Sequence, residues 1–239
     1  MKSRFSIPKY VLVLLAFTLV NVIILAVRNK IVGTGTFNFL HSNLLSGIMP
    51  LIIAVLIQMF EDKLSTFWFL FGCFVWVIFY PNSPYMISDL IHAHEEGLNS
   101  VYPSLIIYDT LIIFSIAMLS VFYGFVSLKL MFLLFRDRFG VKKSHVFVVV
   151  SIILSCIGFY VGRELKSGTD FGNGFLYSWQ LFTEPIYVIK IVWKHLWPIG
   201  ENANTYYMML LFGFIQYQLL VMMKDIKDIE QGEIITKDL

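Results

Sequence analysis

Two acidic residues and a histidine are spaced along the chain so that they could share one face of a helical turn. Asp89, His92 and Glu96 stand at positions i, i+3 and i+7, and side chains at such spacings are neighbours on a helix. An imidazole oriented by a carboxylate can act as a general base. The spacing therefore favours acid–base chemistry, although Asp and His at i, i+3 also occur together by chance.

Further ionisable residues lie in or beside long apolar segments. Asp109 stands one turn inside such a segment, and Arg163 and Glu164 follow the next one. An aspartate at membrane depth costs on the order of 2.5–3.5 kcal/mol, so it usually faces protein or water and has a partner. Asp109 and Arg163 therefore either form a structural salt bridge or belong to one outward-facing pocket.

These residues together predict a site with two alternative chemistries. Asp89, His92 and Asp109 are the predicted catalytic residues, and the same three could hold a divalent metal. Without a metal, His92 would act as a base oriented by a carboxylate. An arginine is suited to anionic groups such as phosphate, and the predicted binding residues are Asn82, Tyr85, Arg163, Glu164 and Trp179.

The composition of the chain predicts a membrane protein. Hydrophobic residues make up 58% and charged residues 14% of the sequence, whereas soluble domains average roughly 45–50% and about 25%. One globular core could not bury this much apolar surface, so membrane lipid is the expected partner. The net charge of +2 and the lack of a basic stripe argue against a nucleic-acid partner.

Six apolar segments approach the roughly 20 residues that a helix needs to cross a bilayer. We therefore expect an all-α polytopic transmembrane bundle of about six spans, forming a single domain over residues 1–239. The predicted spans cover residues 10–27, 44–60, 64–80, 105–128, 145–161 and 206–223, and a short cytoplasmic tail covers 224–239.

The distribution of basic residues predicts the orientation. Residues 81–104 include no Lys or Arg, whereas residues 129–143 include five. Cytoplasmic loops carry an excess of Lys and Arg, so residues 81–104 are expected outside. Both termini are then cytoplasmic, in what we expect to be a bacterial cell membrane.

Two of the expected outer connections include helical signals. Ser83 followed by Pro84 predicts an N-cap and first helical position after Pro81 has ended the third span. In residues 162–203, Thr183 could cap a helix with Pro185 in its first turn. That helix would place Lys190 and Lys194 on one side and Ile186, Ile189, Trp193 and Leu196 on the other. This pattern predicts a short interfacial helix in the headgroup layer; a re-entrant half-membrane segment is the alternative.

Several of these residues belong to a longer pattern that resembles a known family. The matching residues are Phe79-Tyr80-Pro81-Asn82-Ser83-Pro84-Tyr85, Ser88-Asp89-Leu90-Ile91-His92, Tyr108-Asp109 and Gly162-Arg163. They resemble the signature of a bacterial multi-span membrane family known as domain of unknown function 1361. The resemblance implies a membrane location and highlights Asn82, Asp89, His92, Asp109 and Arg163, but it implies no known reaction.

The chain also departs from the family pattern. Lys166 stands for the second basic residue that follows the Gly-Arg pair, and Tyr177-Ser178-Trp179-Gln180 replaces an earlier Asn-Ser-Trp-Asp. Gln180 occupies the place of an acid, which argues against an acid–base role at that position.

Three function hypotheses follow from these observations. The first is an enzyme at the outer leaflet that hydrolyses or transfers a group on a lipid-linked or envelope substrate. The second is a scaffold or assembly protein without chemistry. The third is a small-solute transporter, which is less favoured because transporters usually place ionisable groups near the bilayer midplane on broken helices.

Overall fold

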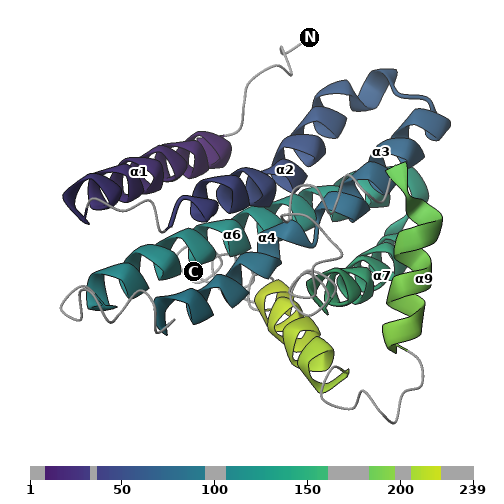
Figure 1. The fold of residues 1–239 in the computed structure, drawn as a ribbon. Helices are drawn as coiled ribbons and strands as arrows, with labels where there is room; N and C mark the ends of the chain where they lie inside the picture. Colours follow the sequence, from purple (N-terminus) through teal and green to yellow (C-terminus); the bar gives the residue numbers. More distant parts are fainter. Residues whose placement is uncertain (1–8, 33–36, 95–105, 161–182, 197–205, 222–239) are drawn as a thin grey trace, which may run out of the picture.

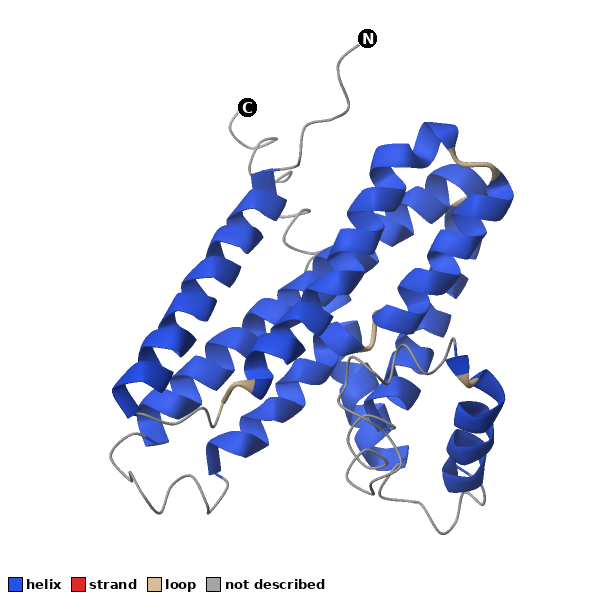
Figure 2. Cartoon of the chain, turned by 45° about the horizontal axis from the view of Figure 1, so that its top comes forward, coloured by secondary structure: helices blue, strands red, loops and turns tan. Residues whose placement is uncertain are grey.

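The computed structural model describes residues 9–32, 37–94, 106–160, 183–196 and 206–221 of the 239-residue chain. All regular elements in these ranges are helices (Figures 1 and 2). In chain order they are α1 (Lys9–Val32), α2 (Phe39–Phe60), the 3₁₀ turn η1 (Glu61–Lys63), α3 (Thr66–Phe79), α4 (Asn82–Tyr85), the 3₁₀ helix η2 (Met86–His94), α6 (Ile106–Phe139), α7 (Val141–Tyr160), α9 (Pro185–Leu196) and the C-terminal helix Tyr206–Val221.

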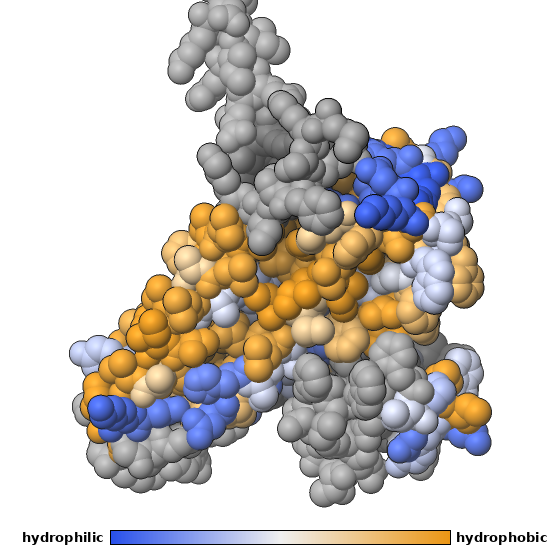
Figure 3. Space-filling view, turned by 90° about the horizontal axis from the view of Figure 1, so that it is seen from above, coloured by the Kyte–Doolittle hydropathy of each residue, from blue (hydrophilic) through white to orange (hydrophobic). Residues whose placement is uncertain are grey.

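The described helices confirm an all-α polytopic membrane bundle. Five helical segments are long and apolar enough to cross a bilayer, and the C-terminal helix is a shorter apolar one. Many large apolar side chains point outwards, including Leu19, Phe67 and Leu111, each about three-fifths or more exposed. Figure 3 shows a broad apolar surface with hydrophilic residues gathered towards its ends. Lipid is the solvent that suits such a surface.

The longest helix, α6, forms the centre of the bundle. It packs against α2, η2, α7 and α1, and in Figure 1 it runs through the middle of the structure. At about 1.5 Å per residue its 34 residues extend roughly 50 Å, which exceeds the roughly 30 Å hydrocarbon thickness of a bilayer. Both ends of α6 can therefore reach the polar layers.

Two tight turns lie at one end of the bundle. The short connection between α2 and α3 is formed by η1, and Arg138 of α6 donates to the carbonyl oxygens of Glu61 and Leu64 at this turn. Residues 129–143, expected as a basic connection, are instead helical except at Gly140. Gly140 has a φ of 88°, a left-handed conformation that glycine adopts without steric cost, so α6 reverses directly into α7.

The third span continues beyond Pro81 as a broken helix. α3 ends at Phe79, and the chain then forms α4 and η2 inside the bundle. The prediction that Ser83 caps this segment is wrong: Pro81 stands at the N-cap without a side-chain cap bond. The Ser83 hydroxyl instead donates to the Gly47 carbonyl oxygen of α2, because a buried hydroxyl stabilises an interhelical contact where water is excluded.

Glycines on two neighbouring helices allow this broken segment to lie close to them. A Cβ at Gly124 of α6 would stand 2.9 Å from the Ser83 Cβ, and one at Gly158 of α7 would stand 2.7 Å from the Pro81 Cβ. Small residues permit such close backbone approach in membrane bundles. The break in the third span is therefore held between α2, α6 and α7.

Candidate functional site

Four elements bring polar side chains to one end of the bundle. They are the last turns of α1, the first turns of α2, the 3₁₀ helix η2 and the first turn of α6. We call the seven residues Arg28, Phe37, Phe39, Asn43, Asp89, His92 and Asp109 the rim cluster. Hydrogen bonds, ion pairs and ring contacts connect its members in two groups, and an edge-on contact between the rings of Phe37 and Phe39, with 6.2 Å between the centroids, joins one group to the other.

The first group is a buried ion pair between α1 and α6. Arg28 Nε lies 2.9 Å from Asp109 Oδ1, and Arg28 Nη2 lies 2.8 Å from Asp109 Oδ2. The side chains of the pair are only 9% and 8% exposed, and the guanidinium carbon stands 4.4 Å from the centroid of the Phe37 ring. This is the bidentate geometry that makes Arg–carboxylate pairs strong and directional.

The second group is centred on Asp89 in η2. The amide of Asn43 donates to Asp89 Oδ2 at 2.8 Å, and His92 Nε2 lies 3.9 Å from Asp89 Oδ1. A 3₁₀ helix has three residues per turn, so side chains at i and i+3 stand directly above each other. The predicted Asp89–His92 proximity is therefore present, and it follows from the 3₁₀ geometry of η2.

The two members of this pair differ in their access to solvent. The Asp89 side chain is 2% exposed and that of His92 is 23% exposed. The His92 ring also packs edge-on against Phe39, with 4.9 Å between the ring centroids. The carboxylate is therefore enclosed, whereas the imidazole is held on one side and reaches the surface on another.

Asp89 lies inside the bundle and not in the loop beyond it. Met86, one 3₁₀ turn earlier, is 1% exposed and belongs to a core cluster with Ile113, Ile116 and Tyr123 of α6. Figure 1 shows the segment after α4 running beside α6. The spanning segment that begins at Thr66 accordingly extends to His92.

Of the remaining predicted site residues, two lie in the part of the chain that the structure describes and three lie outside it. Asn82 and Tyr85 are in α4, where the Tyr85 ring packs against Phe159 of α7 at 6.0 Å. Arg163, Glu164 and Trp179 lie outside the described residues, and so do Glu96 and the expected Asp109–Arg163 contact.

The predicted metal ligands are not assembled into one set. Among the described residues, no group of three or more His, Cys, Asp or Glu side chains is placed to hold a metal ion. Asp89 and His92 lie together, while both carboxylate oxygens of Asp109 accept from Arg28.

Sequence reasoning missed Arg28 and Asn43 as members of the cluster. Arg28 directly follows the first apolar segment and Asn43 directly precedes the second, positions where polar residues commonly flank a membrane span. An arginine directly after a spanning segment is nevertheless a natural partner for an aspartate at the same depth.

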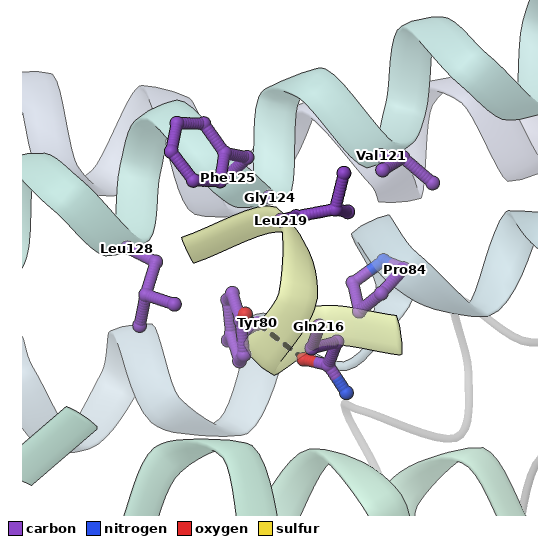
Figure 4. A pocket seen from close by; sticks show the side chains of 8 residues that line it. All are labelled: Tyr80, Pro84, Val121, Gly124, Phe125, Leu128, Gln216 and Leu219. Carbon is purple, nitrogen blue, oxygen red and sulfur yellow. Dashed lines mark hydrogen bonds between the residues drawn. The ribbon is translucent and has the colours of Figure 1, made fainter. Parts of the chain in front are cut away.

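A second polar group lies at the break of the third span, away from the rim. Tyr80 Oη donates to Gln216 Oε1 at 3.0 Å, and Gln216 Nε2 donates to Ser155 Oγ at 2.7 Å. These contacts connect α3, α7 and the C-terminal helix. Beside them is a cavity of about 10 Å³, lined mainly by apolar residues (Figure 4), with room for about one water molecule.

Comparison with known proteins gives a family for this chain. The family described as "Protein of unknown function (DUF1361)" matches residues 42–219, which is most of the sequence and includes all of the rim cluster except Arg28, Phe37 and Phe39. No curated protein and no solved structure matches the chain significantly. The chain therefore belongs to the DUF1361 family, as its Pro81–Tyr85 and Asp89–His92 motifs predicted.

Proposed function

We propose that this protein is a membrane enzyme that uses acid–base catalysis to hydrolyse or transfer a group on a lipid-linked or envelope substrate at the outer leaflet. One observation carries the proposal: a buried carboxylate, fixed by an amide, stands beside a partly exposed imidazole. Asn43 fixes Asp89, and Asp89 lies 3.9 Å from His92.

The difference in exposure assigns the roles. His92, at 23% exposure, is the group that can reach a substrate and exchange a proton with it. Asp89 is too enclosed to touch a substrate and acts by orienting the imidazole and stabilising its charged form, as carboxylates do beside catalytic histidines. The 3.9 Å separation is longer than a hydrogen bond, and such contacts commonly tighten when substrate binds.

In this proposal Asp109 has a structural role. Its two oxygens both accept hydrogen bonds from Arg28, so the carboxylate is already occupied by a partner within the protein. The pair fixes the first turn of α6 and the end of α1 next to η2, so it shapes the surroundings of His92 without reacting.

The outer-leaflet assignment rests on charge. Arg136, Arg138, Lys142 and Lys143 gather where α6 turns into α7, at the opposite end of α6 from Asp109. The positive-inside rule puts that turn in the cytoplasm of a bacterial cell and Asp109, with the rest of the rim cluster, on the outside. Both chain ends would then be cytoplasmic.

The experiment compares product formation by full-length variants in nanodiscs. Wild-type protein is incubated with a bacterial envelope lipid extract, and mass spectrometry records species that change with time. We expect a wild-type-dependent product that is lost in His92→Ala and reduced at least about 100-fold in Asp89→Asn, the scale of general acid–base catalysis.

Two variants at the other end of the bundle provide matched controls. His145→Ala and Asp137→Asn alter exposed residues of the same types and should retain wild-type product formation. Unchanged product formation in a correctly folded His92→Ala protein would refute the proposed enzyme.

A second candidate, a small-solute or proton-coupled transporter, is favoured by the broken third span. Transporters place binding sites at discontinuous helices that contain ionisable groups, and Asp89 is buried in such a segment. Under this candidate, proteoliposomes with a trapped pH dye should show a flux that Asp89→Asn abolishes and Asp137→Asn retains. The absence of flux together with His92-dependent product formation would leave only the enzyme.

A further inference from the structure

Helix α9 is a short helix that differs from the spanning helices in length. It begins at Pro185, the first helical position that proline favours, and the Val188 amide donates to the Glu184 carbonyl at 3.1 Å. At about 1.5 Å per residue its 12 residues extend roughly 18 Å, which is too short to cross a bilayer. In Figures 1 and 2 it stands at the edge of the structure.

One side of α9 is buried and another is exposed. Val188 is 1% exposed, so this side of the helix is packed. Ile186, Ile189 and Trp193, at i, i+3 and i+7, are 68%, 61% and 66% exposed. These three residues form a continuous apolar stripe, which we call the α9 stripe.

The charge of α9 has one sign. The helix includes Lys190 and Lys194 and no Asp or Glu, and Lys190 is exposed. At 3.6 residues per turn, both lysine positions fall next to the α9 stripe, and lysine can bury its methylene groups in an apolar layer while its ammonium group reaches towards charge. A protein partner would have to match both features, whereas an anionic lipid leaflet presents acyl chains and phosphates side by side.

We infer that α9 is a binding site for anionic phospholipid, with the α9 stripe inserted among the upper acyl-chain segments and Lys190 and Lys194 binding the headgroup phosphates. Amphipathic helices with Trp and Ile on one face and Lys on the other bind membranes in this way. Each lysine near an anionic surface contributes attraction that falls off within a Debye length. The lipids next to α9 should therefore be enriched in anionic species.

The test places a bimane fluorophore on the α9 stripe of the full-length protein in vesicles. Ile189→Cys is labelled, with Phe122→Cys on the exposed face of α6 as a mid-membrane reference and Asp137→Cys as a solvent reference; the native Cys73 and Cys156 are buried. We expect the Ile189→Cys label to be quenched by a nitroxide near the headgroup and not by one at the acyl-chain end or by iodide.

Anion preference is measured by placing the shallow nitroxide on phosphatidylglycerol or on phosphatidylcholine. Quenching should be about twofold or more stronger with phosphatidylglycerol. The ratio should fall to about one in Lys190→Gln/Lys194→Gln and in 0.5 M salt. The matched control Lys142→Gln/Lys143→Gln, at the start of α7, should keep the wild-type ratio.

Four results would overturn the inference. In the first, iodide quenches the Ile189→Cys label as strongly as the Asp137→Cys label; in the second, the nitroxide at the acyl-chain end quenches it as strongly as the Phe122→Cys label. In the third, iodide and both nitroxides fail to quench it, as a covering protein partner would cause. In the fourth, the ratio of quenching by phosphatidylglycerol to quenching by phosphatidylcholine is the same after both lysines are replaced.

Discussion

Arg28 and Asp109 are joined by two parallel hydrogen bonds of 2.9 and 2.8 Å across 81 positions of the sequence. α1 packs mainly against α6, and most of its large apolar side chains face outwards. A hydrogen bond between Thr18 and Tyr123 also joins the two helices. The ion pair is therefore a principal determinant of where the first helix sits.

Removing one partner of this ion pair should destabilise the protein strongly. Asp109→Asn or Arg28→Met leaves a buried group without its counter-charge, which costs about 3–5 kcal/mol. The double variant Arg28→Met/Asp109→Leu should recover most of that loss, because apolar residues can replace a buried pair. Unfolding of purified protein by titration with SDS measures these free energies.

The exposed pair of Arg136 and Asp137 serves as the control. Its atoms lie 2.9 Å apart, as close as those of the buried pair, but the side chains are 41% and 56% exposed. Arg136→Gln should change the unfolding free energy by less than about 1 kcal/mol. If the single and double variants of Arg28 and Asp109 lost equal amounts of unfolding free energy, the two residues would not form a buried ion pair.

The places where apolar helices begin could be predicted because hydropathy is a local property, although six spans are expected and five of the described helices are long enough to cross a bilayer. The apolar segments at 64–80 and 206–223 needed no knowledge of their neighbours, and helices occupy both regions. The partner of Asp109 could not be predicted in the same way. Arg28 and Arg163 both follow apolar segments at the same expected face, and sequence spacing does not say which one is nearer.

The path of the chain after Pro81 shows a second limit of sequence reasoning. Ser83-Pro84 is a good local signal for a helix start, yet Ser83 bonds to Gly47 of another helix. The i, i+3 spacing of Asp89 and His92 was informative because it holds in any tight helix. Their depth was not predictable, since residues 81–104 are expected as an outer connection with a short helix. Ser83, Met86 and Asp89 are instead buried, where α4 and η2 pack against α2 and α6.

Asn43 should act on catalysis through Asp89. Asn43→Ala removes a donor to a buried carboxylate, an interaction worth about 1.5–3 kcal/mol, so the unfolding free energy should fall by about that amount. Product formation per folded protein should also fall, at least about tenfold, because Asp89 is no longer held in place. Asn43→Asp should be worse, because it places a second carboxylate beside Asp89. The assay is the envelope-lipid conversion described above, normalised to folded protein.

Asn29→Ala is the matched control for this variant. Asn29 also donates its amide, to Asn38 at 2.9 Å, but on the exposed rim. Product formation should stay at the wild-type level. An Asn43→Ala protein as active as Asn29→Ala would show that Asp89 needs no amide partner.

The close approach of Pro81 to Gly158 predicts a sharp steric effect. A Cβ at position 158 would meet the Pro81 Cβ and Cγ at 2.7 and 2.8 Å, and a proline ring cannot rotate away. Gly158→Ala should therefore destabilise the protein by about 1–3 kcal/mol, the usual cost of overpacking. At Gly72, the nearest atom is the flexible Ile57 Cδ1 at 3.0 Å, so Gly72→Ala should cost clearly less. Equal unfolding free energies for the two variants would argue against the tight contact.

The hydrogen bond between Tyr80 and Gln216 should couple the third span to the C-terminal helix. Both groups are buried, at 2% and 5% exposure, and the bond is 3.0 Å long. Interhelical hydrogen bonds in membranes average about 0.6 kcal/mol and reach about 1.7 kcal/mol. A double-mutant cycle of Tyr80→Phe and Gln216→Leu, measured by SDS unfolding, should give a coupling energy in that range.

A second double-mutant cycle distinguishes the Tyr80–Gln216 hydrogen bond from the apolar packing of the C-terminal helix. Phe159 and Phe212 stack at 4.2 Å between α7 and the C-terminal helix, so Phe212→Leu weakens the attachment of that helix without touching Gln216. Combined with Tyr80→Phe, it should be additive within about 0.3–0.5 kcal/mol. A Tyr80–Gln216 coupling no larger than this residual would mean that apolar packing alone holds the C-terminal helix against the break in the third span.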